Sequence, residues 1–259
     1  MGRTMIQPAR LRRRARALAR EFGPVFGAGR VGLWRHPVWT SPTRDGAGLG
    51  VVVVPGFGGS DPSMALLRRW LERRGYRPVG ASLALNLGCT ADLVDRLERR
   101  VAEHVRRTGG PVVLLGHSRG GWLGRIVAVR RPDLVCGLVM MGSPVLDPLD
   151  ARGPGPLLLQ VLVRLSGIGV PGLLDRDCLD GSCRDATVDG LGAPIPVPAV
   201  ALYSRDDGVV GWESCRDPHA EWVEVRSSHT GMGVDPDLYE ELVPRLAGWA
   251  AGRLGRPAA

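Results

Sequence analysis

A short segment around Ser118 carries the clearest chemical signal of the sequence. The run Gly116-His117-Ser118-Arg119-Gly120 has the pattern G-x-S-x-G, between an apolar run and a helical stretch. In a sharp turn from strand to helix the serine hydroxyl is exposed, and flanking glycines remove Cβ atoms that would collide. The N–H of the next residue and the positive end of the helix then lie near a reacting carbonyl oxygen. The segment therefore predicts Ser118 as the nucleophile of an acyl-transfer reaction.

A serine hydroxyl becomes a strong nucleophile only with a base, and the base needs an acid that orients it. His229 lies in a loop directly after the predicted strand 222–225. Catalytic residues of parallel sheets gather at the carboxyl ends of the strands. His219 precedes the same strand, so it is expected at the opposite end. We therefore predict His229 as the base.

Two neighbouring aspartates compete for the role of the acid. Asp206 and Asp207 both follow the predicted strand 199–203 at its carboxyl end. Asp147, after an earlier predicted strand, is a more remote candidate. Each of the two neighbours is also explained as an ordinary turn residue.

A second glycine-rich loop supplies a further candidate group. Residues 56–59 follow the first predicted strand, and their glycines allow a substrate to approach the backbone closely. On a sheet of this kind, the loop after the first strand provides one donor of the oxyanion hole. We predict the backbone N–H groups of Phe57 and Arg119 as the two donors. A phosphate-binding loop is disfavoured because no Lys-Ser/Thr pair follows the glycines.

Apolar runs alternate with amphipathic stretches from residue 50 onward. The runs show no polar alternation, which is typical of parallel strands that are buried on both faces. The pattern predicts an α/β fold with a mostly parallel sheet of six to seven strands and helices on both faces. The predicted strands are 51–54, 78–85, 112–115, 134–141, 199–203 and 222–225.

One long segment interrupts this alternation. Residues 145–197 hold six of the 21 prolines and an almost uniformly apolar helix at 157–165. An insertion of this length and composition is typical of a lid or a wall over a site. We predict a hydrolase domain over residues 49–259, with residues 145–197 as its lid insertion.

The positive charge of the chain is concentrated at its start. All 34 basic residues are arginine, the net charge is +8, and residues 1–20 carry seven arginines without an acid. Subtracting +7 from +8 leaves the other residues near +1, so the body is nearly neutral. Residues 1–48 are predicted to form a basic helix followed by an irregular arm. Nucleic acid is disfavoured as a partner class because no aromatic residues interleave the arginines.

The location of the basic helix stays open between two alternatives. Its apolar stripe, formed by Leu11, Ala15, Leu18 and Phe22, could dock on the domain or lie on an anionic membrane surface. No continuous apolar stretch follows the arginines, and no run of about 18 apolar residues exists. The sequence therefore predicts a cytoplasmic protein, with peripheral membrane contact as the alternative.

The five cysteines do not indicate a disulfide framework, because their number is odd. Cys178 and Cys183 are close enough in sequence to bridge, and the sequence leaves that bridge open. Asp175, Asp177 and Asp180 lie beside them but miss the spacing of a calcium loop by one residue. No histidine is near for zinc, so no metal and no cofactor are predicted.

Four segments together resemble the α/β-hydrolase superfamily, and within it bacterial lipases and esterases. They are PGFGGSD, GHSRGG, SRDDGVV and SSHTGM, in this order within about residues 50–250. The resemblance implies the order serine, acid, histidine along the chain. It favours Asp207 over Asp206, because Asp207 precedes a glycine and lies in a D-x-x-V turn.

The chain departs from the family at two places. The family begins with an antiparallel hairpin, whereas residues 23–48 are short and rich in Pro and Gly, with room for one edge strand near 31–39. Arg119 stands where small or apolar residues are more usual, and we expect its side chain to be solvated.

The resemblance implies a serine hydrolase that cleaves carboxylic esters of medium- or long-chain acids through an acyl-enzyme, without a cofactor. Its expected partner is a small acyl ester or lipid substrate. An acyltransferase, a thioesterase and a peroxidase-like or carbon–carbon bond-cleaving enzyme on the same triad remain alternatives. A membrane-associated member of the fold without turnover is a further one.

Overall fold

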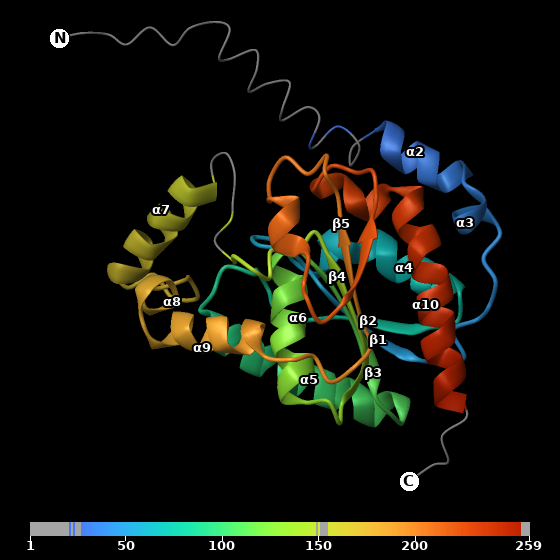
Figure 1. Cartoon of the computed structure of the whole chain (residues 1–259), viewed down its shortest axis with the longest axis horizontal. Helices are drawn as coiled ribbons and strands as arrows, with labels where there is room; N and C mark the ends of the chain where they lie inside the picture. Colours follow the sequence, from blue (N-terminus) through green and yellow to red (C-terminus); the bar gives the residue numbers. More distant parts are fainter. Residues whose placement is uncertain (1–20, 22, 24–26, 149, 151–154, 255–259) are drawn as a thin grey trace, which may run out of the picture.

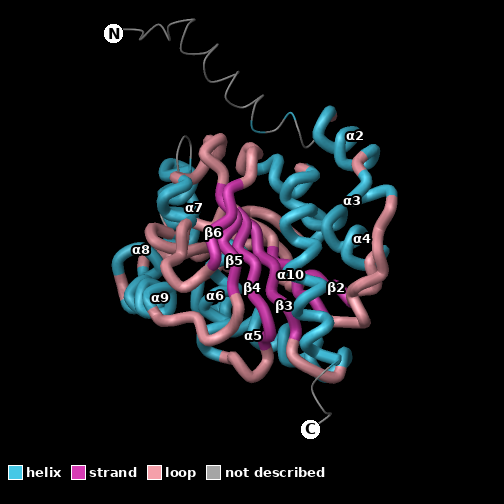
Figure 2. The backbone as a smooth tube through the Cα atoms, turned by 45° about the vertical axis from the view of Figure 1, so that its right-hand side comes forward, coloured by secondary structure: helices cyan, strands magenta, loops and turns pink. Residues whose placement is uncertain are grey.

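A six-stranded parallel sheet forms the centre of the molecule. The computed structural model describes residues 21, 23, 27–148, 150 and 155–254. Every neighbouring pair of strands is parallel, in the order β2-β1-β3-β4-β5-β6. The predicted parallel sheet is confirmed, with six strands (Figures 1 and 2). The strands are β1 (Gly50–Val54), β2 (Arg77–Gly80), β3 (Val112–His117), β4 (Val135–Met141), β5 (Ala199–Tyr203) and β6 (Glu221–Glu224).

Helices cover both faces of the sheet and bury one apolar core on each. One face carries α2, α3, α4 and α10, and the other carries α5, α6 and α9 (Figure 1). Successive strand residues point to opposite faces, so Val51 and Val53 join the first core while Val52 and Val54 join the second. The helices are α2 (Ala28–Arg35), α3 (Pro37–Thr40), α4 (Ala65–Arg73), α5 (Thr90–Thr108), α6 (Arg119–Arg130), α7 (Gly155–Gly167), α8 (Asp177–Asp180), α9 (Ser182–Gly192) and α10 (Pro236–Leu254), with 3-10 turns η1 (Asp61–Met64), η2 (Trp212–Cys215) and η3 (Thr230–Val234).

The edge strand predicted near residues 31–39 is wrong, because this segment forms α2 and α3. Pro37 occupies the first turn of α3, where its missing N–H costs nothing, and the ring of His36 accepts a hydrogen bond from Val38 N. Leu33 and Trp39 are buried in the core beside α4 and α10. The buried apolar residues of this segment thus face the core from two short helices and not from a strand.

The second strand is shorter than predicted. It ends at Gly80, and Ser82 and Ala84 have positive φ angles of 57° and 21°, which a strand does not allow. Asp61 stabilises this turn by accepting a hydrogen bond from Ser82 N at 3.2 Å. Residues 81–85 therefore leave the sheet edge as a loop.

The segment 145–197 contains three of the helices, α7, α8 and α9. Helix α9 packs on α5 and α6, whereas α7 lies farther from the sheet (Figure 1). Several apolar side chains in and near α7 are exposed, namely Val161, Leu165, Ile168 and Val170. The structure thus places an apolar surface in the predicted lid.

A buried ion pair joins α6 to the segment between β5 and β6. Arg125 and Asp217 are both fully buried and paired through two hydrogen bonds, and Arg125 also donates to the carbonyls of Gly190 and Ala193 at 2.8 and 2.9 Å. Burial makes this pair sensitive to loss of one partner, because the remaining charge has no compensation.

Asp217→Asn should therefore lower the free energy of unfolding by about 3–5 kcal/mol. The matched control is Asp133→Asn, which breaks a similar two-bond pair with Arg131 on the surface and should cost at most about 1 kcal/mol. Urea denaturation of the two variants measures both values. Equal losses would contradict a special role of the buried pair.

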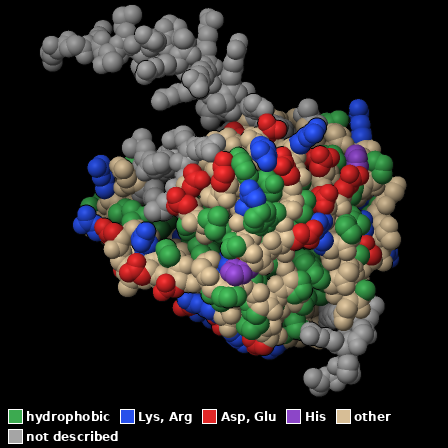
Figure 3. All heavy atoms as spheres, in the orientation of Figure 1, with side chains coloured by type: hydrophobic (Ala, Val, Ile, Leu, Met, Phe, Trp, Pro, Cys, Tyr) green, Lys and Arg blue, Asp and Glu red, His purple; other side chains and the backbone are tan. Residues whose placement is uncertain are grey.

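Acidic and basic side chains are mixed over the surface seen in Figure 3 rather than gathered by sign. None of the helices in the described part of the chain is long and apolar enough to cross a membrane. The predicted basic helix of residues 1–20 lies outside the described residues.

Candidate active site

The sharp turn predicted around Ser118 connects β3 to α6. Ser118 has φ 53° and ψ −125°, a conformation that costs of order 1–3 kcal/mol for a residue with a side chain. A Cβ atom at Gly116 would lie 2.4 Å from Gly120, and one at Gly120 would lie 2.4 Å from the carbonyl oxygen of Val54. Gly116 is therefore required by the turn itself, and Gly120 by the close contact between the turn and β1. The serine is held at the carboxyl end of β3, and its N–H donates to Met141 O at 2.8 Å.

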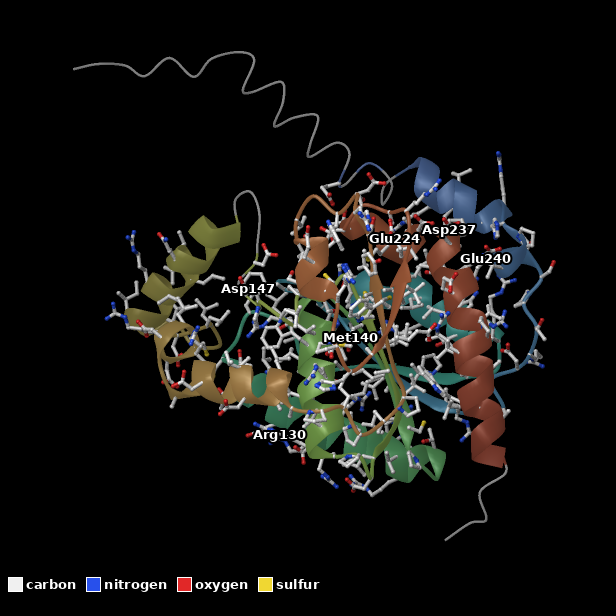
Figure 4. All side chains as sticks on the ribbon, in the orientation of Figure 1. Arg130, Met140, Asp147, Glu224, Asp237 and Glu240 are labelled. Atoms are coloured by element: carbon white, nitrogen blue, oxygen red, sulfur yellow. The ribbon has the colours of Figure 1, made fainter. Side chains whose placement is uncertain are left out.

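His229 and Asp207 meet at the same edge of the sheet. The distance between His229 Nδ1 and Asp207 Oδ2 is 2.6 Å, and both side chains are buried. Asp207 follows β5, and His229 lies in the loop after β6, whose last residue Glu224 is labelled in Figure 4. Arg130, at the far end of α6, marks the opposite edge in the same view.

The surroundings of Asp207 keep its carboxylate ionised. Burial alone would raise its pKa, but hydrogen bonds from His229 and from the backbone N–H groups of Val209 and Val210 hold the pKa below its ordinary value. Asp206 is exposed, and its backbone N–H donates to Ser204 Oγ at 3.1 Å. The structure thus brings Asp207, and not Asp206, to the histidine.

His117 connects the serine turn to the histidine loop. Its Nε2 lies 2.9 Å from His229 O, and the two rings are 4.7 Å apart. Removal of the ring from water, together with the nearby His229, lowers the pKa of His117 to about 4. His117 is thus neutral at neutral pH.

His117 should make stability depend on pH in a defined direction. The folded chain leaves His117 neutral down to about pH 4, whereas the unfolded chain protonates it below about pH 6.5. The unfolded chain therefore binds more protons between these values, so stability is full above pH 6.5 and falls as the pH drops toward 4. Between pH 7 and pH 4, wild type should lose roughly 3 kcal/mol more than His117→Gln.

Urea denaturation at a series of pH values tests this expectation. The control is His219→Gln, because His219 is exposed and its loss should leave the pH dependence of wild type in place. If the free energy of unfolding depends on pH in the same way for wild type and His117→Gln, the low pKa of His117 is refuted.

The loop after β1 lies beside the serine turn. A Cβ atom at Gly56 would lie 3.2 Å from Ser118 Cβ, which shows how closely the two segments approach. Asn86, fully buried, fixes this loop: its Nδ2 donates to Pro55 O at 2.8 Å, and its backbone pairs with Gly58 and Gly59. No hydrogen bond to another described residue occupies the backbone N–H of Phe57 or that of Arg119.

The expectation that the Arg119 side chain is solvated is wrong. The side chain is buried, and it donates to Gly88 O at 2.8 Å, Thr90 Oγ1 at 3.1 Å and Asn86 O at 3.4 Å. Its guanidinium also lies over the rings of Phe57 and Trp122. Burial lowers the pKa of Arg119 to about 10, which leaves it charged at neutral pH.

Glu21 is a site residue that the sequence reasoning missed. Its carboxylate accepts hydrogen bonds from Gly208 N at 2.8 Å and from Thr230 N at 3.4 Å, and its backbone oxygen accepts one from Ser228 Oγ. Glu21 thus bridges the loop that holds Asp207 and the loop that holds His229. Its one sequence signal is that it is the first acid after the seven arginines.

Comparison with known families gives a match over half of the chain. The alpha/beta hydrolase fold matches residues 31–162. Among curated proteins, the spectinabilin polyketide synthase system protein NorC of Streptomyces orinoci is 30% identical over 195 residues. These residues are 71% of this chain but 8% of NorC, so the chain spans less than a tenth of that relative.

Solved structures of several hydrolases share the fold at low identity. A monoacylglycerol lipase of Paleococcus ferrophilus is 20% identical with a TM-score of 0.55, covering 78% of this chain and 94% of its own. The lipase BlEst2 of Bacillus licheniformis is 15% identical with a TM-score of 0.57, covering 80% and 94%. A structure from a study of carboxylesterases of Nitrososphaera gargenis is 18% identical with a TM-score of 0.55, covering 80% and 93%.

Proposed function

Since this chain belongs to the alpha/beta hydrolase family, we propose that it cleaves carboxylic esters, with Ser118, His229 and Asp207 as the catalytic triad. The observation that carries the proposal is the 2.6 Å hydrogen bond between His229 and Asp207 at the edge where Ser118 is held in a strained turn. A buried carboxylate bound to one ring nitrogen leaves the other nitrogen of the histidine to act on the nucleophile.

The reaction follows from the protonation of this pair. With the proton of His229 on Nδ1, toward Asp207, the lone pair of Nε2 is available to accept the proton of Ser118 Oγ. The oxygen attacks the carbonyl carbon, and the backbone N–H groups of Phe57 and Arg119 stabilise the oxyanion. The imidazolium then protonates the leaving alcohol, and water releases the acid by the same steps in reverse.

The composition of the lid supports an acyl chain longer than acetyl. Exposed apolar side chains lie in and near α7, among them Ile168, which is 79% exposed. Apolar surface of this kind favours a hydrocarbon chain over a small polar acyl group. We therefore assign medium- or long-chain esters as the substrate class.

A series of p-nitrophenyl esters from acetate to palmitate tests the proposal. Ser118→Ala is the control for hydrolysis that does not depend on the proposed nucleophile. Hydrolysis by the wild type that rises with chain length supports both the reaction and the lid assignment. An optimum at acetate would contradict the long-chain assignment alone. Equal, background-level hydrolysis by both proteins on every ester would contradict the ester hydrolase.

A thioesterase is the second candidate, because the relative NorC is named for a polyketide synthase system. The triad attacks a thioester by the same steps, with a thiolate as the leaving group. Matched octanoyl esters of p-nitrophenol and of a pantetheine-like thiol separate the two functions. A kcat/KM that is at least tenfold higher for the thioester would favour the second candidate.

Membrane contact through the arginine-rich residues 1–20 would bring the enzyme to lipid substrates. Vesicles of neutral and of anionic lipid, pelleted with the whole chain and with a chain lacking residues 2–20, test this proposal. Pelleting with anionic vesicles that disappears on truncation supports it. Unchanged pelleting would refute it.

A further inference from the structure

Three cysteines from two distant parts of the chain converge beside the lid. We propose that Cys89, Cys178 and Cys183 bind one zinc ion, which fastens the lid helices α8 and α9 to the start of α5. This site is separate from the proposed triad and does not depend on the ester hydrolase assignment.

The distances between the sulfurs fit a shared metal ion. Cys178 Sγ and Cys183 Sγ are 3.3 Å apart, Cys89 Sγ and Cys183 Sγ are 3.7 Å apart, and all three lie within 4.8 Å of one another. Zinc–sulfur bonds are about 2.3 Å long, so two sulfurs on a tetrahedral zinc lie about 3.8 Å apart. Three thiolates leave a fourth position for water, and soft thiolate ligands select zinc over hard cations.

The backbone around the lid cysteines is fixed before any metal binds. Asp175 Oδ1 accepts a hydrogen bond from Cys178 N at 3.1 Å, and Asp177 Oδ2 accepts one from Cys183 N at 3.0 Å. A Cβ atom at Gly181 would lie 2.0 Å from Asp177 Oδ1, so this turn requires glycine. Asp175 and Asp177, two of the three aspartates whose spacing misses that of a calcium loop, therefore position the two cysteines.

Cys89 completes the cluster from the other side. It directly precedes α5, and the N–H of Thr90 points to Cys178 Sγ at 3.5 Å. An N–H directed at sulfur stabilises a thiolate, as does the positive end of a long helix. The first turn of α5 thus provides both one ligand and one supporting donor.

The buried charge of Arg119 is an independent observation that points to the same site. Its hydrogen-bond acceptors are neutral, two backbone carbonyls and a hydroxyl oxygen, and no carboxylate among the described residues pairs with it. A buried cation without an anion is costly. Zinc with three thiolates carries a net charge of −1. The guanidinium donates to Gly88 O and Thr90 Oγ1, on either side of Cys89, and its charge would be balanced by this complex.

Zinc titration of the full-length chain tests the proposal. The reduced protein is first freed of metal with a chelator. Zinc is then added in the presence of a chromophoric chelator that competes for it, and the number of zinc ions bound per chain is determined from the absorption of that chelator. We expect one zinc per chain, and loss of that zinc in Cys89→Ser, Cys178→Ser and Cys183→Ser. Cys136→Ser is the matched control, because Cys136 is half-buried and lies outside the cluster. Cobalt in place of zinc should give thiolate-to-cobalt charge-transfer absorption.

Each other outcome overturns the proposal. If the reduced wild type binds no zinc, the site does not exist, whatever the variants do. If the protein isolated without reductant holds a Cys178–Cys183 disulfide and the reduced form binds no zinc, the cluster is a disulfide site. Zinc binding that Cys89→Ser retains would remove Cys89 from the site. Ser118→Ala should bind zinc as wild type does. Zinc binding therefore tests the cysteine site independently of the ester hydrolase assignment.

Discussion

Replacing Ser118 with alanine should lower kcat for ester hydrolysis by about 10⁶-fold, the loss measured when a triad serine is removed. The alanine variant keeps the glycines and the strained turn, so the oxyanion donors and the substrate contacts remain. A residual rate about 10³–10⁴-fold above that in water is expected from these contacts alone. KM should change little, because the role proposed for Ser118 Oγ is to attack the reacting carbon rather than to bind the substrate.

The matched control for this substitution is Ser63→Ala, which removes an exposed serine hydroxyl on η1. Its kcat should stay within a few-fold of wild type. Covalent labelling with a fluorophosphonate, followed by mass spectrometry, provides a second readout: wild type should gain one adduct at Ser118, and Ser118→Ala none. An adduct on another serine would assign the nucleophile elsewhere.

Asp207→Asn should lower kcat by about 10⁴-fold with little change in stability, by analogy with the loss of the acid in other serine triads. The amide can donate to Nδ1, which favours the proton on Nε2 and leaves that nitrogen unable to accept the serine proton. The comparison Asp206→Asn changes the neighbouring, exposed carboxylate and should keep kcat within about tenfold of wild type.

The pair of variants separates the two aspartates that the sequence alone left in competition. If Asp206→Asn proves the more damaging, the acid has been misassigned, and the bond between Asp207 and His229 is structural. If both variants are nearly as active as wild type, the histidine is oriented by its backbone surroundings, among them the contact between His229 O and His117.

Local patterns predicted the parts of the fold that neighbouring residues determine. The continuous apolar runs placed the four inner strands β1, β3, β4 and β5, which are buried between the two layers of helices, whereas the two edge strands β2 and β6 are partly exposed. The glycines around Ser118 signalled the turn because the turn itself, in contact with β1, excludes any Cβ atom at Gly116 and Gly120. These features need no knowledge of distant residues.

The predictions that failed depended on contacts between distant segments. Arg119 was expected in water, but the loop that ends at Thr90 encloses its guanidinium and supplies the acceptors. Val31 and Trp39 were interpreted as strand residues, although Pro37 and His36 start a helix there and Leu33 packs on the core. Burial by distant segments has no signal in a short sequence window.

The cysteine cluster also depends on a contact between segments that are distant in the sequence. The sequence offered Cys178 and Cys183 as neighbours, whereas Cys89 precedes Cys183 by 94 residues and joins them through the packing of α9 on α5. Asn86, which fixes the loop around Phe57, likewise acts over 31 residues to Pro55. Neither contact follows from periodicity.

The bridge made by Glu21 has a consequence for the order of events during synthesis. Its partners Gly208 and Thr230 follow it by 187 and 209 residues. At about 5–20 residues per second, a ribosome needs roughly 10–40 s to add them. Glu21 therefore emerges from the ribosome well before the residues that it contacts. The two loops that carry Asp207 and His229 can be bridged by Glu21 only after both of them have been synthesised.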